Sequence, residues 1–460
     1  MTMKIHDTLS RAKTEFVPID AQHVRMYVCG PTVYDYAHIG NARPVVVFDV
    51  LARLLRTQYP KVTYVRNITD VDDKINNRAR ELGQDIRDIT RRTTEIFHAD
   101  MAELGALPPD IEPRATDHIA EMITMIEGLI SKGNAYVEDG HVLFSVPSMP
   151  EYGRLSKLDK REIVAGAWVD IAPYKHDPQD FVLWKPSSDD LPGWNSPWGR
   201  GRPGWHIECS AMSLAHLGES FDIHGGGLDL IFPHHENEIA QSKCAHGADS
   251  FAKYWMHNGY LMSEGEKMSK SLGNFYTVHD LLKEFPGEAI RLALLKSHYR
   301  QPLDFTKDGL REAKADLDRF YSGLRRHSAD TASGDGIPQA VLTALCDDLN
   351  TPAAISALHP CLAALNKAPV GNASLEKHHL LAAGKLLGLF AQDPEDWFKW
   401  QAAARTETGL SDSEIDALVA KRRQARADKD FAASDQIRDT LTAQGIVLED
   451  GAAGTTWRRE

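Results

Sequence analysis

The amino-acid sequence predicts an α/β protein, with a parallel-sheet domain divided by an insertion, a helical domain and a small C-terminal α+β domain. Three observations lead to this prediction. Buried β-branched runs alternate with helical patterns on both sides of a central segment, an order typical of parallel sheets. The central segment, 147–204, is rich in Pro, Gly, Trp and Ser and has few periodic stretches. Beyond Thr277, Leu and Ala recur at helical spacing to about Phe390.

The first half of the sheet domain contains one β-α-β unit. Residues 24–29 predict a strand that ends at Gly30 and Pro31, and residues 41–58 predict the helix that follows. Residues 61–69 predict a second, buried strand that is parallel to the first. Open parallel sheets bind ligands at the carboxyl ends of their strands, so the loop after the first strand is the expected site.

The other elements are mostly helical. A long charged helix is expected over 73–104, and another, closed by Gly133, over 116–132. Glu138 to His141 have the pattern of a hairpin turn. The rest of the chain predicts helices at 205–217, 234–246, 413–429 and 431–444, and strands at 220–224 and 254–262.

These elements group into five segments. They are the first half of the sheet domain at 1–104, the insertion at 105–204, the second half at 205–276, the helical domain at 277–395 and the C-terminal domain at 411–460.

Composition narrows the class of protein. The formal net charge of −13 argues against a protein that coats nucleic acid, although a local basic groove is compatible with it. The longest apolar run, Pro44 to Phe48, is cut by Asp49 and is far too short to span a membrane. The N-terminus shows no secretory segment, and five scattered cysteines do not suggest a disulfide framework. We expect a reduced, cytoplasmic monomer with no membrane partner.

A phosphate-binding motif is predicted between the first strand and the first helix, at His38-Ile-Gly-Asn41. Gly40 leaves the backbone open to a nucleotide, and the helix N-terminus presents free N–H groups to phosphate. His38 can donate a hydrogen bond while charge moves in a transition state. Taken alone, the motif also fits a histidine that merely caps the helix.

A second motif, Lys267-Met-Ser-Lys-Ser271, follows a predicted strand. Two lysines on a loop bounded by Ser and Gly suit a clamp on a triphosphate, because their ammonium groups act as point charges. Taken alone, this segment also fits a solvated charged loop. The two motifs occur in this order on opposite halves of a divided α/β domain, and together they indicate a triphosphate-binding site.

Four side chains that can bind a metal are predicted to meet at the carboxyl edge of the sheet. Cys29 ends the first strand, and Cys209 lies on the helix that opens the second half. His234 and Glu238 are four residues apart, so they share one face of a helix. No CxxC pair is present, and spacing alone therefore does not define a zinc site.

The sequence resembles the class I aminoacyl-tRNA synthetases, and among them the cysteine–tRNA ligases. The segments His38–Asn41 and Lys267–Ser271 resemble the paired HIGH and KMSKS elements that bind ATP in the class. Asn41 replaces the last histidine of HIGH, and an asparagine can still hydrogen-bond a ribose or a phosphate. Segments similar to the cysteine–tRNA ligases are 26–35, 67–74, 204–212, 222–229, 232–238, 347–352 and 429–438.

The resemblance implies a Rossmann-type catalytic domain that uses ATP, with Mg²⁺, to attach L-cysteine to tRNA(Cys) through a cysteinyl-adenylate. It implies catalytic roles for His38, Asn41, Lys267 and Lys270, and ATP contacts from these four residues together with Gly40 and Ser271. The amino-acid pocket that it implies contains Thr32, Thr69, Trp205 and Asp229, and the implied zinc ligands are Cys29, Cys209, His234 and Glu238. Asp229 would pair with the substrate ammonium group, and Trp205 would close over it. The histidines His206 and His224 either line the same pocket or belong to the core, and Cys244, Cys346 and Cys361 are expected in the core.

Zinc gives such an enzyme a way to select cysteine. Serine differs from cysteine by one atom, and a shaped pocket separates such close analogues by only about 10²-fold. Zinc binds thiolate at about 2.3 Å and promotes loss of the thiol proton, whereas the serine hydroxyl gains much less. A separate editing domain is then unnecessary, which agrees with the short insertion.

The C-terminal segment is expected to read the anticodon. Lys421 to Arg423 and Arg426 place positive charge on one helix, and Trp457 beside Arg458 is expected to stack on an exposed base. Without the resemblance, these residues fit an ordinary solvated helix face equally well.

Three other functions compete with this prediction. A cysteine ligase that acts on an amino-sugar would share the catalytic half but lack residues 400–460. A non-catalytic tRNA-binding relative would have lost His38, Lys270 or the metal-binding residues, all of which are present. A zinc hydrolase would have no role for Lys267–Ser271.

Overall fold

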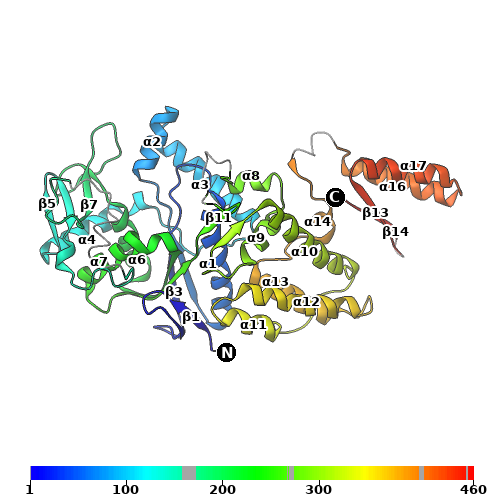
Figure 1. Ribbon diagram of the computed structural model, residues 1–460, viewed down its shortest axis with the longest axis horizontal. Helices are drawn as coiled ribbons and strands as arrows, with labels where there is room; N and C mark the ends of the chain where they lie inside the picture. Colours follow the sequence, from blue (N-terminus) through cyan, green and yellow to red (C-terminus); the bar gives the residue numbers. More distant parts are fainter. Residues whose placement is uncertain are drawn as a thin grey trace.

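The computed structural model describes residues 2–157, 172–266, 268, 274–403, 409–451 and 454–459. The molecule is elongated, with the central sheet between the insertion at one end and the helical domain, followed by the C-terminal helices, at the other (Figure 1).

The centre of the molecule is a four-stranded sheet in the order β10-β9-β3-β4, and all of its strands are parallel. The strands are β3 (Val24–Val28), β4 (Val62–Arg66), β9 (Ser220–Gly227) and β10 (Phe251–Asn258). Helix α1 (Ile39–Gln58) connects β3 to β4. Because β3 pairs with β9 across the insertion, the two halves of the sequence form one sheet, and the predicted fold class is confirmed.

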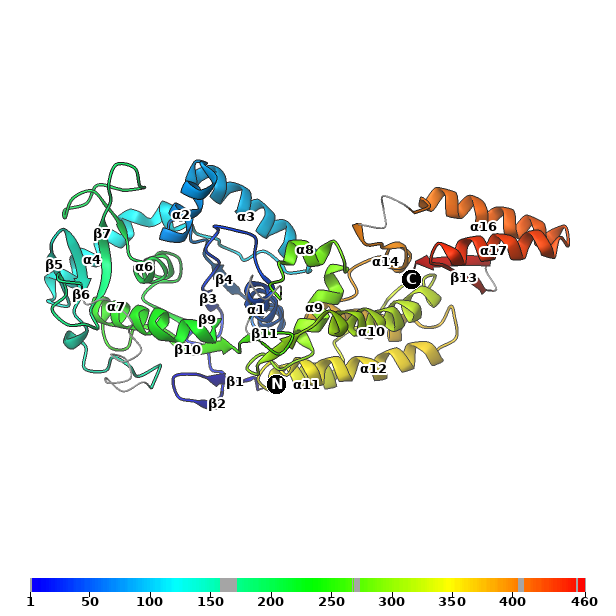
Figure 2. The ribbon, with the colours of Figure 1, turned by 45° about the horizontal axis from the view of Figure 1, so that its top comes forward.

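Both faces of the sheet are buried, as parallel sheets require. Met26 and Ile223 point into one core, where α1 and the helical domain pack. Tyr27, which follows Met26 on β3, and Phe221 of β9 belong to a second core. That second core also contains side chains from the insertion and from α6 (Trp205–Leu217). Figure 2 shows α1 and α6 on opposite sides of the strands.

The prediction of one long helix over 73–104 is wrong. The structure has α2 (Asp73–Leu82) and α3 (Ile86–Glu103), separated by a short turn. Gly83 ends α2 in the left-handed conformation, with φ of 62°, and the Asp85 side chain caps α3 by accepting a hydrogen bond from the Arg87 N–H. A glycine followed by an acidic cap is a sufficient reason for two helices.

The insertion contains a second sheet, which is antiparallel in the order β5-β6-β7-β8. Its strands are β5 (Ala135–Glu138), β6 (His141–Phe144), β7 (Phe181–Pro186) and β8 (Gly201–Pro203). The hairpin predicted at Glu138 to His141 is confirmed as the β5–β6 turn. The last two strands were not predicted, because Pro and Gly interrupt the pattern around them. Two short 3-10 turns and one α-helix complete this part of the chain: η1 (Ala115–His118), α4 (Ile119–Ser131) and η2 (Val146–Ser148).

The second half of the sheet domain adds two 3-10 or π segments and a helix before β10: η3 (Leu228–Leu230), η4 (Ile231–His235) and α7 (Glu236–His246). Two further small sheets flank the domain, the antiparallel pair β1 (Lys4–Asp7) and β2 (Ala12–Glu15), and the parallel pair β11 (Leu261–Ser263) and β12 (Leu303–Phe305).

The helical domain follows the predicted helical pattern. Its helices are α8 (Val278–Leu282), α9 (Gly287–Leu295), α10 (Lys307–Arg326), α11 (Gln339–Cys346), α12 (Thr351–Lys367), α13 (Ser374–Leu387) and α14 (Pro394–Lys399). None of the helices in the described ranges is long and apolar enough to span a membrane.

The C-terminal part is a small α+β unit, as expected. It contains α16 (Asp412–Ala427), α17 (Phe431–Ala443) and an antiparallel hairpin of β13 (Ile446–Gly451) and β14 (Gly454–Arg459). Its own core is made by Ile415, Leu441, Ile446 and Trp457. The residue boundaries given above for the five segments stay predictions.

Candidate active site

The carboxyl edge of the central sheet holds a cluster of thiol, imidazole and carboxylate groups, in which Cys29 is half-buried and the other side chains are buried. Cys29 follows β3 directly, and its N–H donates to the Gly225 carbonyl of β9 at 3.1 Å. Cys209 lies on α6, and Glu238 lies in the first turn of α7. His234 lies on η4, two residues before the start of α7. The four predicted metal-binding side chains therefore come from separate segments and meet at one point, with ligand atoms within 4.8 Å of one another.

The distances in this cluster fit a tetrahedral zinc ion. The Sγ atoms of Cys29 and Cys209 are 3.8 Å apart. Two sulfur ligands at about 2.3 Å from zinc are separated by about 3.8 Å in a tetrahedron. His234 Nε2 lies 3.1 Å from Glu238 Oε1. Nitrogen and oxygen ligands at about 2.0 Å would be about 3.3 Å apart. The donor set of two thiols, one imidazole and one carboxylate is one that zinc prefers.

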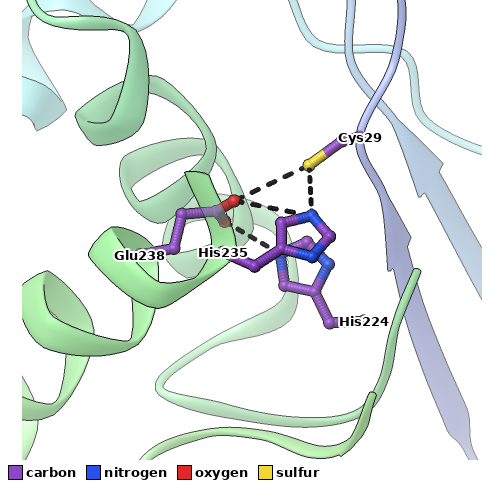
Figure 3. Close-up of side chains that lie close together, drawn as sticks. All are labelled: Cys29, His224, His235 and Glu238. Atoms are coloured by element: carbon purple, nitrogen blue, oxygen red, sulfur yellow. Dashed lines mark hydrogen bonds and ion pairs between the residues drawn. The ribbon is translucent and has the colours of Figure 1, made fainter. Parts of the chain in front are cut away.

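A second group of ligands overlaps with the first. Cys29, His224, His235 and Glu238 also have ligand atoms within 4.8 Å of one another (Figure 3). His235 Nε2 is 3.3 Å from Cys29 Sγ, and His224 Nε2 is 2.8 Å from Glu238 Oε2. The two groups share Cys29 and Glu238, so they are alternative ligand sets for a single metal ion and not two separate sites.

Sequence reasoning missed the part that His235 plays. Its Nδ1 lies 2.7 Å from His257 Nε2, and His257 Nδ1 lies 2.8 Å from the Thr8 hydroxyl. The hydrogen-bonded chain fixes the ring of His235 beside Cys29. The adjacent histidines at 234 and 235 were the available signal, but only His234 has a glutamate four residues later.

Burial sets the protonation of the cluster. It raises the pKa of Cys29 well above its usual range, with the neighbouring Cys209 adding to the effect. The hydrogen bond from Cys29 lowers the pKa of Cys209, but burial and the carboxylates of Glu238 and Glu208 outweigh it, so that the net shift is upward. Burial also lowers the pKa of His234 well below its usual value. Without a metal ion, the thiols are therefore protonated and the His234 imidazole is neutral. A divalent cation would displace the thiol protons, because its charge stabilises the thiolates that bind it.

The residues predicted for the amino-acid pocket lie around this cluster. Thr32 and Thr69 form an isolated parallel bridge, and the Thr69 hydroxyl donates to Glu208 at 3.3 Å. The Trp205 ring stacks on His234, with a centroid distance of 4.2 Å, and keeps 40% of its surface exposed. Asp229 lies on η3, the short segment after β9. One face of the Trp205 ring packs on the buried His234, and the other face is free to cover a substrate.

The first phosphate motif lies at the start of α1. The Asn41 side chain accepts a hydrogen bond from the His38 N–H at 3.1 Å, which caps the helix. Among the described residues, no hydrogen-bond partner reaches the buried His38 Nδ1. Burial lowers the pKa of His38, and the carboxylate of Asp229 opposes that shift. The imidazole is thus neutral at physiological pH.

The second motif is described only at Met268. A Cβ atom on Gly40 would lie 3.2 Å from Met268 Cε, so this residue packs directly on the first motif. Lys267, Lys270 and Ser271 lie outside the described residues.

In the C-terminal unit, two predicted tRNA contacts are wrong. Trp457 is only 4% exposed, and its indole N–H donates to Asp416 at 2.8 Å, so its ring cannot stack on a base. Arg422 is buried, and its guanidinium forms a pair of hydrogen bonds with Asp450. Phe431, at 63% exposure, is the aromatic ring that the unit presents to solvent. Periodicity did not distinguish these side chains, because the β13–β14 hairpin, which carries Trp457 and Asp450, was not predicted.

Comparisons with known proteins define the class. Residues 15–315 match the family model of the tRNA synthetases class I (C) catalytic domain, and residues 340–391 match the DALR domain. The fold is similar to a LeuRS from Agrobacterium radiobacter, solved in a ternary complex (TM-score 0.58, 13% identity, covering 83% of this chain and 86% of the other). It is also similar to the methionyl-tRNA synthetase of Mycobacterium tuberculosis (TM-score 0.55, 14% identity, covering 80% and 89%). The chain has the fold and the catalytic domain of a class I aminoacyl-tRNA synthetase.

The relatives in sequence are more specific. Residues 409–458 match the cysteinyl-tRNA ligase anticodon binding domain. The chain is 64% identical to the cysteine–tRNA ligase of Rhodospirillum rubrum and 63% identical to that of Paramagnetospirillum magneticum, with 100% of both chains covered in each comparison. The chain belongs to the cysteine–tRNA ligase family.

Proposed function

We propose that this enzyme attaches L-cysteine to tRNA(Cys) in two steps and selects cysteine through a zinc ion held by Cys29, Cys209, His234 and Glu238. The observation that carries the proposal is the pair of thiols 3.8 Å apart at the carboxyl edge of the sheet, after the strand β3 that leads to the His38 motif. Family membership supports cysteine and tRNA(Cys) as substrates. The predictions of a monomer, a cytoplasmic location and Mg²⁺ accompanying ATP rest on the sequence.

We favour this ligand set over the one with His224 and His235 because it contains both thiols and is the set that the resemblance implies. His224 Nε2 is hydrogen-bonded to the far oxygen of Glu238, which orients that carboxylate toward its other partners. The second ring nitrogens of His234 and His235 are each held by another histidine, His206 and His257 respectively, as is usual for histidines at a metal site. Zinc, when bound, supplies a thiophilic Lewis acid that favours a thiolate over a hydroxyl.

In the first step, a carboxylate oxygen of cysteine attacks the α-phosphorus of ATP, and the bond to the departing pyrophosphate breaks. His38 donates a hydrogen bond to a phosphate oxygen, and Asn41 holds the His38 turn in place. Lys267 and Lys270 neutralise the charge that develops on pyrophosphate. Catalysis is then positioning and electrostatic stabilisation, since no covalent bond to the enzyme is needed.

The amino-acid pocket holds the substrate during this step. Asp229 pairs with the cysteine ammonium group, which carries charge opposite to its own. Thr32 and Thr69 line the pocket between the two strand ends, and the exposed face of Trp205 covers the substrate. In the second step, a hydroxyl of the terminal ribose of tRNA attacks the acyl carbon, loses its proton and displaces AMP.

The test is cysteine-dependent ATP–pyrophosphate exchange, followed by transfer to an acceptor. We expect exchange in the wild-type chain, a large loss in Lys270→Ala, and normal exchange in Lys61→Ala, which removes an exposed lysine far from the motif. Unchanged exchange in Lys270→Ala would contradict the clamp. Cysteine transferred to an amino-sugar rather than to tRNA(Cys) would favour the rival ligase, although the match at 409–458 argues against it.

A further inference from the structure

Arg43 is a fully buried arginine in the helix that carries the first ATP motif. It lies on α1 two residues after Asn41, and its side chain is 0% exposed. Within the described part of the chain, its guanidinium has no carboxylate partner. Four backbone carbonyls accept its hydrogen bonds instead: those of Gly259 and Tyr260 at 2.8 Å each, Gln301 at 2.7 Å and His298 at 3.3 Å.

These four carbonyls belong to two segments in close contact. Residues 259–260 lead into β11, and residues 298–301 lead into β12, the strand that pairs with β11. Gly259 N–H donates to the Tyr299 carbonyl at 2.7 Å. A Cβ on Gly259 would lie 2.6 Å from the Gln301 carbonyl oxygen, so that no larger residue fits between the segments. Through these hydrogen bonds, Arg43 connects α1 to the segments that precede both strands of the small parallel sheet.

Strand β11 is followed, after a short turn, by the second ATP motif. The chain that returns from this motif is also attached to the start of α1. Ile39 N–H donates to the Tyr276 carbonyl at 3.0 Å, and Val278 N–H donates to the Ala37 carbonyl at 2.9 Å. Residues 259–266, which precede the second motif, have no such backbone hydrogen bond to α1 among the described residues. The side chain of Arg43 connects them to α1 instead.

We propose that Arg43 is a positioning residue of the ATP site, which holds the approach to the second motif in register with the helix that bears His38 and Asn41. This inference rests on the proposed function. Burial lowers the pKa of Arg43 to about 10, so the group is still charged at neutral pH. A guanidinium has five donors in a planar fork and can serve two segments at once, whereas a lysine ammonium is a single point.

The register matters because both motifs must contact the same triphosphate. A misplacement of about 1 Å in a catalytic constellation can cost about 10²-fold in rate. The cysteine pocket is built by other elements, the ends of β3 and β9 and the starts of α6 and α7. Loss of Arg43 is therefore expected to affect ATP much more than cysteine.

The experiment compares Arg43→Lys and Arg43→Met with wild type in cysteine-dependent ATP–pyrophosphate exchange. We expect kcat/KM for ATP to fall by up to about 10²-fold in Arg43→Met, and by less in Arg43→Lys, with KM for cysteine near the wild-type value. The matched control is Arg291, another arginine at 0% exposure that binds the Leu104 and Leu387 carbonyls and Asp49. Arg291→Met is expected to lower the melting temperature without an ATP-specific loss.

The outcomes separate the inference from the function on which it rests. If the Arg43 and Arg291 variants lose stability and all kinetic constants in parallel, the role of Arg43 is only structural and the inference is wrong. If Arg43→Met does not fold, Gly259→Ala probes the same contact from the other side and should give the same ATP-specific loss; normal ATP kinetics in that variant would overturn the inference. A wild-type chain without cysteine-dependent exchange would overturn the proposed function instead.

Discussion

The Sγ atoms of Cys29 and Cys209 lie 3.8 Å apart, although 180 positions separate the two residues in the sequence. Pairing of β3 with β9 brings the two halves of the chain together, and α6 then places Cys209 over the end of β3. This separation is the one expected for two sulfur ligands of a tetrahedral metal ion. The first prediction concerns which side chains complete that site.

Metal content is expected to depend on Cys209 and His234. Cys209→Ser and His234→Gln should each reduce bound zinc well below one equivalent, because each removes a ligand. His224→Gln and His235→Gln should still bind one zinc, with affinity lower by about 10- to 100-fold, as is typical when a supporting contact is lost. The measurement is metal analysis of purified protein with competition by a chelator.

The matched control for that series is Cys346→Ser, since Cys346 is a buried core cysteine on α11, far from the cluster in sequence and on another element. It should keep its zinc. Full loss of zinc from His235→Gln together with retention in His234→Gln would show that the ion uses the other ligand group.

Trp205 is expected to act on cysteine rather than on ATP. Its ring stacks on His234 and keeps 40% of its surface exposed, so that one face is available to the substrate. Trp205→Ala should raise KM for cysteine by about 10-fold, the scale of one lost aromatic contact, and leave KM for ATP near wild type. Trp205→Phe keeps a ring and should recover most of the loss. Steady-state exchange kinetics give both constants, and equal effects on the two would argue for a general structural role.

Arg325 is expected to couple the C-terminal unit to the rest of the enzyme. It lies at the end of α10, forms two hydrogen bonds with Glu395 at 2.7 and 2.8 Å, and reaches Glu449 of β13 at 3.2 Å. Arg325→Met should therefore lower tRNA charging while cysteine-dependent exchange, which needs no tRNA, stays normal. Arg326→Met, at the exposed neighbouring position, serves as the control. A parallel loss of exchange in Arg325→Met would contradict a role limited to the C-terminal unit.

The C-terminal unit is expected to weaken in acid. The hydrogen bonds from Arg422 and Thr455 hold the pKa of Asp450 well below its usual range. A folded-state pKa below the unfolded value contributes stability that is present above about pH 5 and is lost as the pH falls toward the folded pKa. Hydrogen exchange of residues 412–451 between pH 7 and pH 3 should show this loss, and Asp450→Asn should make the unit less stable at pH 7 and less sensitive to acid. Equal acid sensitivity in the variant would assign the effect to other groups.

The sequence predicted the parallel sheet well because its strands are short, largely apolar runs between helical patterns, and because Gly30, Gly225 and Gly259 mark the ends of three of them. It predicted one helix where α2 and α3 lie, although Gly83 and Asp85 together signal a break. Strands β7 and β8 could not be predicted, since their pairing depends on partners distant in the chain rather than on local pattern.

The candidate site was predictable only in part. Spacing identified His234 and Glu238 as a pair, the ends of the predicted elements placed Cys29 and Cys209 near them, and the resemblance implied all four as zinc ligands. The place of His235 beside Cys29 depends on contacts with His257 and Thr8, which no local pattern reveals. The prediction that Trp457 is exposed was wrong for the same reason. Its indole N–H donates to Asp416, and only the folded chain brings these two residues together.

The selection of cysteine by zinc is tested most directly by ATP–pyrophosphate exchange with cysteine or serine, before and after removal of the metal. We expect the zinc-loaded enzyme to prefer cysteine by far more than the roughly 10²-fold that a shaped pocket provides, and zinc removal to abolish most of that preference. Restoration by added zinc completes the test. An equal rate with serine in the loaded enzyme, or a cysteine preference that is indifferent to zinc, would contradict the proposal.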